Sequence, residues 1–351
     1  MSGCECKPAR SVSAKARNLR QCTQQTRNDT LTRMIAVHLE KRRTSIVHVP
    51  KPRRPAGYSL VRLLCAGICN TDLELLRGYY DFSGTPGHEF VGEVVASDNR
   101  GLVGKRVVGE INLACGKCDW CKRGLGRHCP TRKVLGIVGH AGAFREYLTL
   151  PDVNLHVVPD DIPTGIAVFA EPVAAACEIL DQAVIPKTES IAVLGDGKLG
   201  LLISQVLHAA GFAVHQFGHH RDKLRIAAKK GVVTELVGRS LPVAEFGYVV
   251  DATGASDGLK AAVRMARPRG TVFLKSTIHG NVAVDTAPIV VNEITLVGSR
   301  CGRFEPAIRL LRSGAINVAE MVSDDLPLSK ASQAFKRASQ AGILKVLFHA
   351  D

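Results

Sequence analysis

Two side chains that can bind a metal ion, Cys69 and His88, occur in two short segments of the sequence that also contain carboxylates, Asp72 and Glu89. Cys69 follows the apolar stretch 64–68, whereas His88 and Glu89 directly follow Gly87. A catalytic zinc ion takes three protein ligands and leaves one position for water or substrate. The segments are too far apart in sequence for a local Cys-x-x-Cys site, so they share a metal ion only if the fold brings them together. The alternative is that they are ordinary packed or surface residues.

A second group of possible ligands is far more compact. Four cysteines follow the pattern Cys115-x2-Cys118-x2-Cys121-x7-Cys129. Four soft ligands at this spacing are typical of a closed tetrahedral thiolate site, for which zinc is the first choice. An iron–sulfur cluster is the rival interpretation, because Pro130 follows Cys129, but the last gap is seven residues where the ferredoxin run has three. A closed site has no open position, so we predict a structural zinc ion here.

A glycine-rich segment indicates a nucleotide-binding turn. The apolar strand Ser190–Leu194 leads into Gly195-Asp196-Gly197-Lys198-Leu199-Gly200, and a helical pattern over 201–210 ends before Gly211. A strand before and a helix after this pattern are typical of a dinucleotide-binding site, where the turn and the helix N-terminus receive a pyrophosphate. The alternative is a turn that only connects strand and helix.

The residues at the end of the next strand, Phe212–Phe217, indicate which cofactor binds. An acid there would bind the ribose 2′-hydroxyl of NAD. The strand instead ends in Gly218-His219-His220-Arg221, which offers room and basic partners for a phosphate. The sequence therefore favours NADP over NAD, unless these side chains are simply solvated.

Composition and charge limit the class of protein. The chain has 351 residues, 46% of them hydrophobic, so we expect a buried core in two domains. No run of apolar residues is long enough for a membrane span, and an odd number of cysteines without a secretory signal favours a reducing compartment, taken as the cytoplasm. The net charge of +14 is scattered and not interleaved with aromatic residues, so we predict neither a nucleic-acid nor a membrane partner.

The order of elements predicts an α/β protein. Residues 1–33 are rich in Arg, Ser and Thr, which fits a disordered tail, an upstream start-site extension or an organellar transit peptide. A β-rich part follows from Met34 to about Asp160, and strands then alternate with helices up to about Arg300, as in a parallel doubly wound sheet. Further predicted elements are the strands Tyr58–Leu64, Glu89–Ala96, Lys105–Glu110, Ala143–Leu150 and Leu344–Phe348, and the helices Ile166–Asp181, Ala307–Ser313 and Lys330–Gln340.

These motifs together resemble the zinc-dependent medium-chain dehydrogenase/reductase family, which includes alcohol, sorbitol and threonine dehydrogenases. The resemblance covers about Met34 to Phe348. It implies a GroES-like catalytic domain over 34–160, a Rossmann domain over 161–302 and a return to the catalytic domain over 303–351. It rests on Gly67-Ile-Cys-Asn-Thr-Asp72, Gly87-His-Glu89, the four-cysteine group, Gly142-Ala-Phe144, Glu171-Pro172, the glycine turn and Gly298-Ser-Arg-Cys-Gly302.

The resemblance also implies roles for single residues. Cys69 and His88 look like ligands of a catalytic zinc ion, and Asp72 looks like the carboxylate that orients His88. Classical alcohol dehydrogenases have a second cysteine as third ligand, whereas this chain has Glu171, as in the sorbitol and threonine branch. Glu171 and Glu89 would then share the site, one of them directly and the other directly or through water. Cys177 is an alternative ligand that we interpret as a packed thiol.

The same resemblance implies the chemistry. Zinc lowers the pKa of a bound alcohol, and hydride passes to the nicotinamide ring. Thr71 resembles the hydroxyl that carries the alcohol proton away, but Glu74 stands where many members have the next histidine. Tyr79 and Tyr80 either line the substrate pocket or pack. Lys345 matches a basic residue near the cofactor, although taken alone it would be a surface charge.

Three functions follow as hypotheses. The first is an NADP-dependent, zinc-dependent oxidoreductase of a secondary alcohol, polyol or sugar-like, with two zinc ions per chain and a homodimeric or homotetrameric assembly. The second is an NAD-dependent amino-acid alcohol dehydrogenase of the threonine type. The third is a catalytically silent binding protein, against which the intact ligand set argues.

Overall fold

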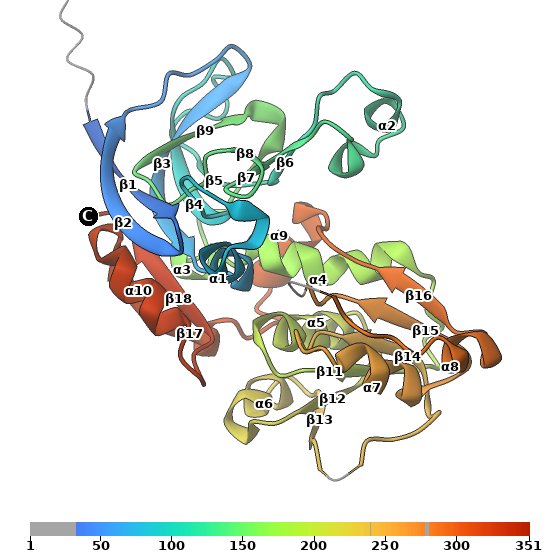
Figure 1. Ribbon diagram of the computed structural model, residues 1–351. Helices are drawn as coiled ribbons and strands as arrows, with labels where there is room; N and C mark the ends of the chain where they lie inside the picture. Colours follow the sequence, from blue (N-terminus) through green and yellow to red (C-terminus); the bar gives the residue numbers. More distant parts are fainter. Residues whose placement is uncertain (1–32, 239, 278–280) are drawn as a thin grey trace, which may run out of the picture. The chain divides into compact units, whose positions relative to one another are not determined.

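The computed structural model describes residues 33–238, 240–277 and 281–351 (Figure 1). The expectation of a disordered or targeting segment over 1–33 therefore falls, apart from Arg33, outside the described residues.

A β-rich part contains the hairpin of β1 (Arg33–Glu40) and β2 (Arg43–Pro50) and a seven-stranded sheet. The sheet has the order β10-β5-β4-β3-β18-β17, and β9 also pairs with β3. Because β18 comes from the end of the chain, the C-terminal segment completes this sheet beside β3. The strands are β3 (Tyr58–Gly67), β4 (Glu89–Ala96), β5 (Arg106–Gly109), β9 (Tyr147–Pro151), β10 (Leu155–Val157), β17 (Val322–Pro327) and β18 (Lys345–His349). A small sheet holds β6 (Asn112–Leu113), β7 (Lys133–Leu135) and β8 (Gly139–His140).

The middle of the chain forms a six-stranded sheet in which all pairs are parallel. In sheet order its strands are β13 (Val233–Leu236), β12 (Ala213–Gly218), β11 (Ser190–Leu194), β14 (Phe246–Asp251), β15 (Ala266–Leu274) and β16 (Thr295–Gly298). The order reverses at β11, which is the point where such sheets bind dinucleotides. The predicted doubly wound parallel sheet is confirmed.

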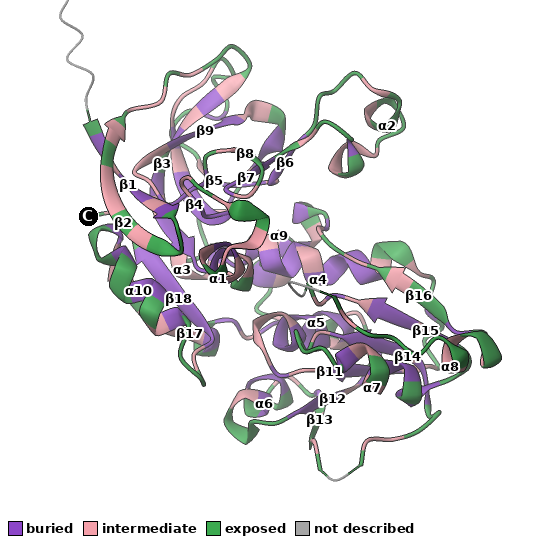
Figure 2. Cartoon of the chain, viewed as in Figure 1, coloured by how far each residue is buried: buried purple, intermediate pink, exposed green. Residues whose placement is uncertain are grey.

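Helices cover both faces of this sheet. The helices of the described chain are α1 (Asn70–Arg77), α2 (Asp119–Lys122), α3 (Thr164–Ala167), α4 (Ala170–Gln182), α5 (Lys198–Ala209), α6 (Arg221–Ala228), α7 (Gly258–Met265), α8 (Ala287–Val291), α9 (Phe304–Arg312) and α10 (Ala331–Ala338). Ile191 and Val193 of β11 pack in one core cluster with α4 and α5, whereas Ala192 and Leu194 pack in another with α7. Alternate side chains of a strand point to opposite faces, so the central strands are buried on both sides (Figure 2).

Two predicted elements were wrong in their limits. The helix expected over Ile166–Asp181 is divided into α3 and α4, because Pro172 has no N–H group and is accommodated only in the first turn of α4. The strand expected over Ala143–Leu150 begins only at Tyr147. The residues before it make other contacts, since the Ala143 N–H donates to the Gly87 carbonyl at 2.8 Å.

Within the described part of the chain, every helix is too short or too polar to cross a bilayer.

Candidate active site and metal centres

The ends of two adjacent strands bring the separated ligand segments together. Strands β3 and β4 pair antiparallel, and their register places Gly67 opposite Glu89. Cys69 follows β3 as the N-cap of α1, and His88 directly precedes β4. The candidate ligand atoms of Cys69, His88 and Glu89 all lie within 4.8 Å of one another. The fold thus assembles a thiol, an imidazole and a carboxylate at one point.

Asp72 holds the two segments against each other. Its buried carboxylate accepts the backbone N–H groups of Cys69 at 2.8 Å and of Gly87 at 3.2 Å. It also lies 3.5 Å from Nδ1 of His88. Asp72 therefore stands where the resemblance placed it, but its shorter contacts are to the backbone rather than to the imidazole ring.

The surroundings of His88 favour positive charge. Burial by itself lowers the pKa of the imidazole, but the Asp72 carboxylate and the Cys69 thiol outweigh burial and raise that pKa well above its usual value. Among the described residues, His88 Nδ1 and Glu89 Oε1 are buried without a hydrogen-bond partner. A buried carboxylate oxygen without a donor costs free energy unless a cation or another donor reaches it. The donor set and its unpaired oxygen fit a zinc ion.

Lys345 is a buried partner of Glu89, so its interpretation as a surface charge was wrong. Its side chain is 2% exposed and donates to Glu89 Oε2. Gly67 makes room for this contact, because a Cβ atom there would lie 2.7 Å from that carboxylate oxygen and 3.2 Å from Cδ of Lys345. The pair leaves only one Glu89 oxygen without a partner.

Glu171 stands outside the group of three. Within the described residues, the 4.8 Å group contains Cys69, His88 and Glu89 and not Glu171. Glu171 lies in the first turn of α4 and is near the same charges: burial raises its pKa to about 7, His88 opposes the shift and Glu89 reinforces it. A shared role of Glu171 and Glu89 on one metal ion stays a prediction.

Other residues of α1 take different positions. The hydroxyl oxygen of Thr71 lies 3.8 Å from the Cys69 sulfur, so it borders the site. Glu74 instead pairs with Arg77 at the surface of α1. Tyr79 packs against the core of the β-rich part, and Tyr80 is 62% exposed. The structure therefore agrees with the packing interpretation for Tyr79.

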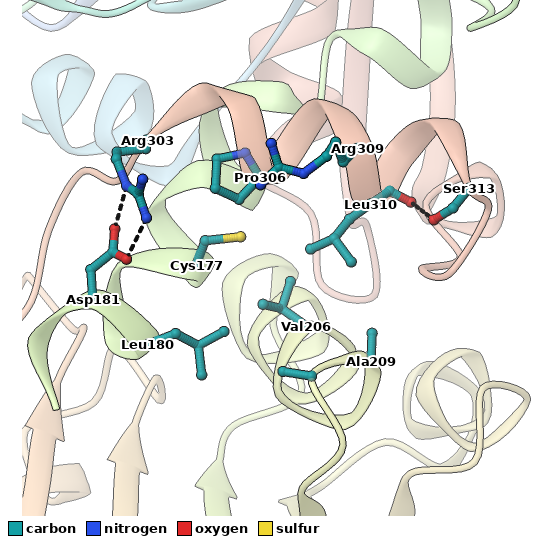
Figure 3. Close-up of a pocket in the computed structure, with 11 residues that line it drawn as sticks. Cys177, Leu180, Asp181, Val206, Ala209, Arg303, Pro306, Arg309, Leu310 and Ser313 are labelled. Atoms are coloured by element: carbon teal, nitrogen blue, oxygen red, sulfur yellow. Dashed lines mark hydrogen bonds and ion pairs between the residues drawn. The ribbon is translucent and has the colours of Figure 1, made fainter. Parts of the chain in front are cut away.

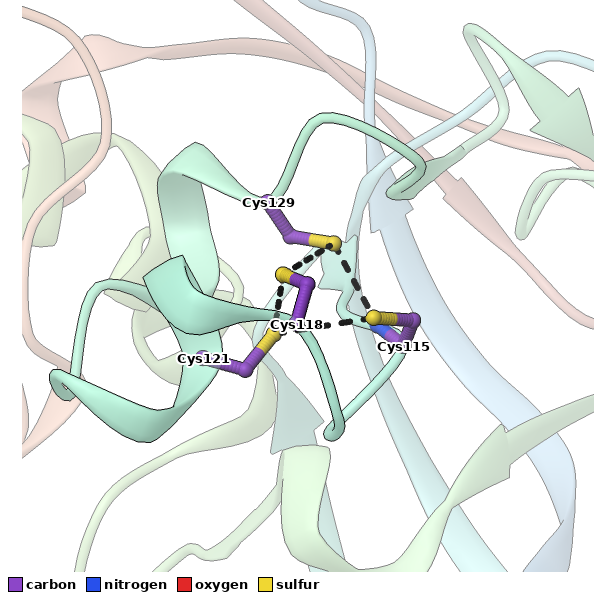
Figure 4. A group of neighbouring side chains, drawn as sticks. All are labelled: Cys115, Cys118, Cys121 and Cys129. Atoms are coloured by element: carbon purple, nitrogen blue, oxygen red, sulfur yellow. Dashed lines mark hydrogen bonds between the residues drawn. The ribbon is translucent and has the colours of Figure 1, made fainter.

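The four-cysteine group is assembled in the loop around α2 (Figure 4). Its sulfur atoms are 3.5 Å apart for Cys118 and Cys121, 3.8 Å for Cys118 and Cys129, and 3.9 Å for Cys115 and Cys121. Four sulfurs on a tetrahedral zinc ion are about 3.8 Å apart, given Zn–S bonds of about 2.3 Å. Backbone N–H groups of Lys117 and Cys118 lower the pKa of Cys115 to about 6, which favours the thiolate. The geometry and the chemistry both fit zinc.

The glycine turn lies beside the Cys69 segment. Gly195 donates its N–H group to the Phe217 carbonyl at 2.8 Å, and Gly197 is the N-cap of α5, whose first turn holds Lys198, Leu199 and Gly200. The Lys198 ammonium donates to the Asn70 side chain at 3.2 Å, and Asn70 directly follows Cys69. A dinucleotide on this turn would therefore reach the candidate metal site.

Two family models match this sequence, one in the β-rich part and one in the part with the parallel sheet. Residues 55–160 match the alcohol dehydrogenase GroES-like domain, and residues 199–313 match the zinc-binding dehydrogenase domain. A D-altritol 5-dehydrogenase from Agrobacterium fabrum is 32% identical over 332 residues, which are 89% of this chain and 98% of that protein. The chain belongs to the zinc-dependent medium-chain alcohol dehydrogenases.

Solved structures of similar dehydrogenases share its fold. A zinc-binding dehydrogenase from Sinorhizobium meliloti bound to NADP superimposes with a TM-score of 0.82 at 28% identity, covering 91% of this chain and 99% of that one. The alcohol dehydrogenase RspB from Escherichia coli CFT073, complexed with NADH, has a TM-score of 0.82 at 25% identity and covers 90% and 99% of the chains. This dehydrogenase is therefore an oxidoreductase with a GroES-like and a Rossmann part, as its motifs predicted.

Cys177 of the dehydrogenase is a packed thiol. It is 4% exposed, and burial raises its pKa to about 12. Its sulfur points into a cavity of about 490 Å³ between α4, α5 and α9, where Leu180, Val206 and Leu310 are among the lining residues (Figure 3). An inert thiol in an apolar setting is a poor zinc ligand.

Sequence reasoning missed the partners of three charged residues of the dehydrogenase. Lys345 could have been found, because it interrupts an otherwise apolar strand. Lys275 ties α4 to the segment after β16, since its ammonium donates to the carbonyls of Ala175 at 2.6 Å and Arg300 at 2.9 Å. Asp196 lies in the glycine turn yet contacts His220, at the end of the next strand. No local sequence pattern indicates the last two contacts.

Replacing Cys121 by serine should remove the structural zinc ion and leave the other site intact. We expect zinc per chain to fall by about one equivalent and Tm to fall by several degrees, because metal binding to such a loop contributes folding free energy. The loop also carries Arg127, which pairs with Glu178 of α4 at 2.9 Å. Metal analysis and calorimetry measure both effects, with Cys301→Ser as the control. Unchanged zinc content in Cys121→Ser would contradict the assignment.

Proposed function

We propose that this dehydrogenase transfers hydride between a secondary hydroxyl group of a polyol or sugar-like compound and NADP. The observation that carries the proposal is the meeting of Cys69, His88 and Glu89 within 4.8 Å, next to the contact between Lys198 and Asn70. This arrangement supports a metal site beside a dinucleotide turn. The similarity to a D-altritol 5-dehydrogenase supports a polyol substrate.

In this proposal Cys69 and His88 hold the catalytic zinc ion together with Glu89 or Glu171. The ion, when bound, supplies Lewis-acid polarisation of the alcohol. Asp72 fixes both ligand segments through its backbone hydrogen bonds. Thr71, which borders the Cys69 sulfur, would accept a hydrogen bond from the alcohol and relay its proton, releasing its own hydroxyl proton to water as it takes up that of the alcohol. The four-cysteine group holds a second, structural zinc ion.

The preference for NADP rests on the loop after β12. The side chains of His219 and Arg221 are exposed there, and within the described residues neither side chain has a hydrogen bond or an ion pair. Basic groups without partners suit a 2′-phosphate. The Sinorhizobium meliloti structure with NADP agrees with this, and the Escherichia coli structure with NADH marks NAD as the alternative. The domain limits, a homodimer or homotetramer and a cytoplasmic location are predictions of the same kind.

A two-step experiment tests the function. Protein dialysed free of cofactor is titrated with NADPH and with NADH, and the fluorescence change gives the two dissociation constants. Zinc-loaded protein is then assayed with NADP or NAD over polyols, sugar alcohols, simple secondary alcohols and L-threonine. We expect tighter binding of NADPH and the highest kcat/KM for a polyol. The highest kcat/KM with L-threonine and NAD would support the threonine-type alternative, and zinc-loaded protein that oxidises none of the alcohols would contradict the proposal.

A further inference from the structure

In sheets that bind dinucleotides, an acid at the end of the second strand binds the adenosine ribose. In this dehydrogenase that strand is β12, which ends without an acid, but an acidic side chain from another segment occupies the same place. Strand β12 ends in Gly218, and a Cβ atom on that glycine would lie 2.5 Å from Cβ and 2.8 Å from Oδ2 of Asp196. Asp196 comes from the glycine turn, one strand away. Its carboxylate therefore fills the space that the side chain of an acid at position 218 would enter.

Asp196 is firmly held in that place by the following loop. Its Oδ2 atom accepts the backbone N–H of His220 at 2.6 Å and lies 2.9 Å from Nδ1 of the same residue. The Asp196 side chain is 10% exposed, whereas the His220 side chain is 52% exposed. Burial raises the pKa of Asp196, but the two contacts with His220 outweigh burial and lower it, so the carboxylate is charged near neutral pH. A charged acid and its histidine partner thus border the cofactor site.

We infer that the Asp196–His220 pair sets the choice between NADP and NAD in this dehydrogenase. The inference rests on the proposed function only in assuming that a nicotinamide dinucleotide occupies the glycine turn. The Asp196 carboxylate accepts the ribose 2′-hydroxyl of NAD and repels a 2′-phosphate. The imidazole of His220 lies against that carboxylate through Nδ1, and the neighbouring Arg221 offsets its charge, so that a 2′-phosphate is tolerated. The two members of the pair therefore act on the preference in opposite directions.

The opposite effects of Asp196 and His220 on the preference distinguish a role in cofactor specificity from a merely structural role. The Asp196→Asn variant keeps an acceptor oxygen for the His220 N–H group but loses the negative charge. The His220→Ala variant keeps that N–H group, and so the anchor of Asp196, but loses the imidazole ring. A pair that only shaped the loop would weaken the binding of both cofactors together in either variant.

The experiment measures dissociation constants of NADPH and NADH by fluorescence for the zinc-loaded wild type and both variants. We expect the ratio Kd(NADH)/Kd(NADPH) to rise about tenfold in Asp196→Asn and to fall about threefold or more in His220→Ala, because the first variant removes a negative charge near the 2′-phosphate and the second leaves the Asp196 carboxylate without its side-chain partner. Asp222→Asn is the matched control, since it removes an exposed acid from the first turn of α6, two residues after His220, and its ratio should stay within about twofold of wild type. Competition by adenosine 2′,5′-bisphosphate and by 5′-AMP isolates the contribution of the 2′-phosphate to binding. The relative affinity of the two competitors should shift in the same directions as the ratio for the cofactors.

Ratios that stay constant in both variants, or that move in the same direction, would overturn the inference, and so would a wild type that binds neither cofactor. The measurement needs no alcohol. Opposite shifts in a protein that oxidises no alcohol would therefore support the inference while the proposed function fails.

Discussion

Replacing Cys69 by serine is expected to abolish nearly all alcohol oxidation, lowering kcat by at least about 10³-fold, because a Lewis acid contributes several kcal/mol of charge stabilisation in the transition state. The hydroxyl of serine is a poor zinc ligand compared with a thiolate. Zinc per chain should fall from about two equivalents to about one, since the four-cysteine group is untouched. Steady-state kinetics and metal analysis of the same preparation measure both quantities.

Cys65→Ser is the matched control for this variant. It makes the same atomic change in the same segment, but Cys65 is buried in β3, and burial raises the pKa of its thiol to about 12. Its zinc content should therefore equal that of the wild type. A Cys69→Ser protein that keeps both zinc ions, or most of its kcat, would show that Cys69 is not a ligand.

Replacing Lys345 by methionine is expected to destabilise the protein by about 3 kcal/mol, because breaking a buried ion pair leaves an uncompensated charge. Lys345 and Glu89 are 2% and 1% exposed, so water cannot replace the lost partner. The change should lower Tm by about 4 °C for a chain of this size. Differential scanning calorimetry of metal-free protein measures the shift, because a zinc ion at Glu89 would itself compensate the carboxylate charge.

The double variant Glu89→Gln/Lys345→Met tests whether the uncompensated charge causes the loss of stability. It removes both charges, so most of the lost stability should return, and the coupling between the two sites should exceed about 1 kcal/mol. Lys336→Met, at an exposed position of α10, should leave Tm unchanged within about 1 °C. Additive effects of the two substitutions would show that the pair does not stabilise this region.

Much of the fold was predictable because its signals are local. The strand Ser190–Leu194 and the glycine turn after it were placed correctly, since an apolar run and a pattern of glycines need no distant partner. The sulfur atoms of the four-cysteine group also converge as predicted, because all four lie in one loop. The start of β9 was misplaced, because residues 142–144 bond to the segment before His88, which is distant in sequence.

The candidate site was predictable in its members but not in its electrostatics. The thiol of Cys69 and the imidazole of His88 were recognised from residue type and motif, and the pairing of β3 with β4 brings them together. The partner of Glu89 was missed, because β18 joins the sheet only through long-range pairing with β3. Asp196 was missed for a similar reason: the strand order places the glycine turn against the end of β12. Contacts between strands that are distant in sequence therefore determine which charges face each other.

We propose that Cys69, His88 and a glutamate hold one metal ion beside the glycine turn. Anomalous diffraction recorded at the zinc absorption edge from crystals of the zinc-loaded dehydrogenase tests it most directly. We expect two peaks per chain, one enclosed by the four cysteine sulfurs and one in contact with both the Cys69 sulfur and the His88 ring. A single peak at the four cysteines, with none at Cys69 and His88, would contradict it.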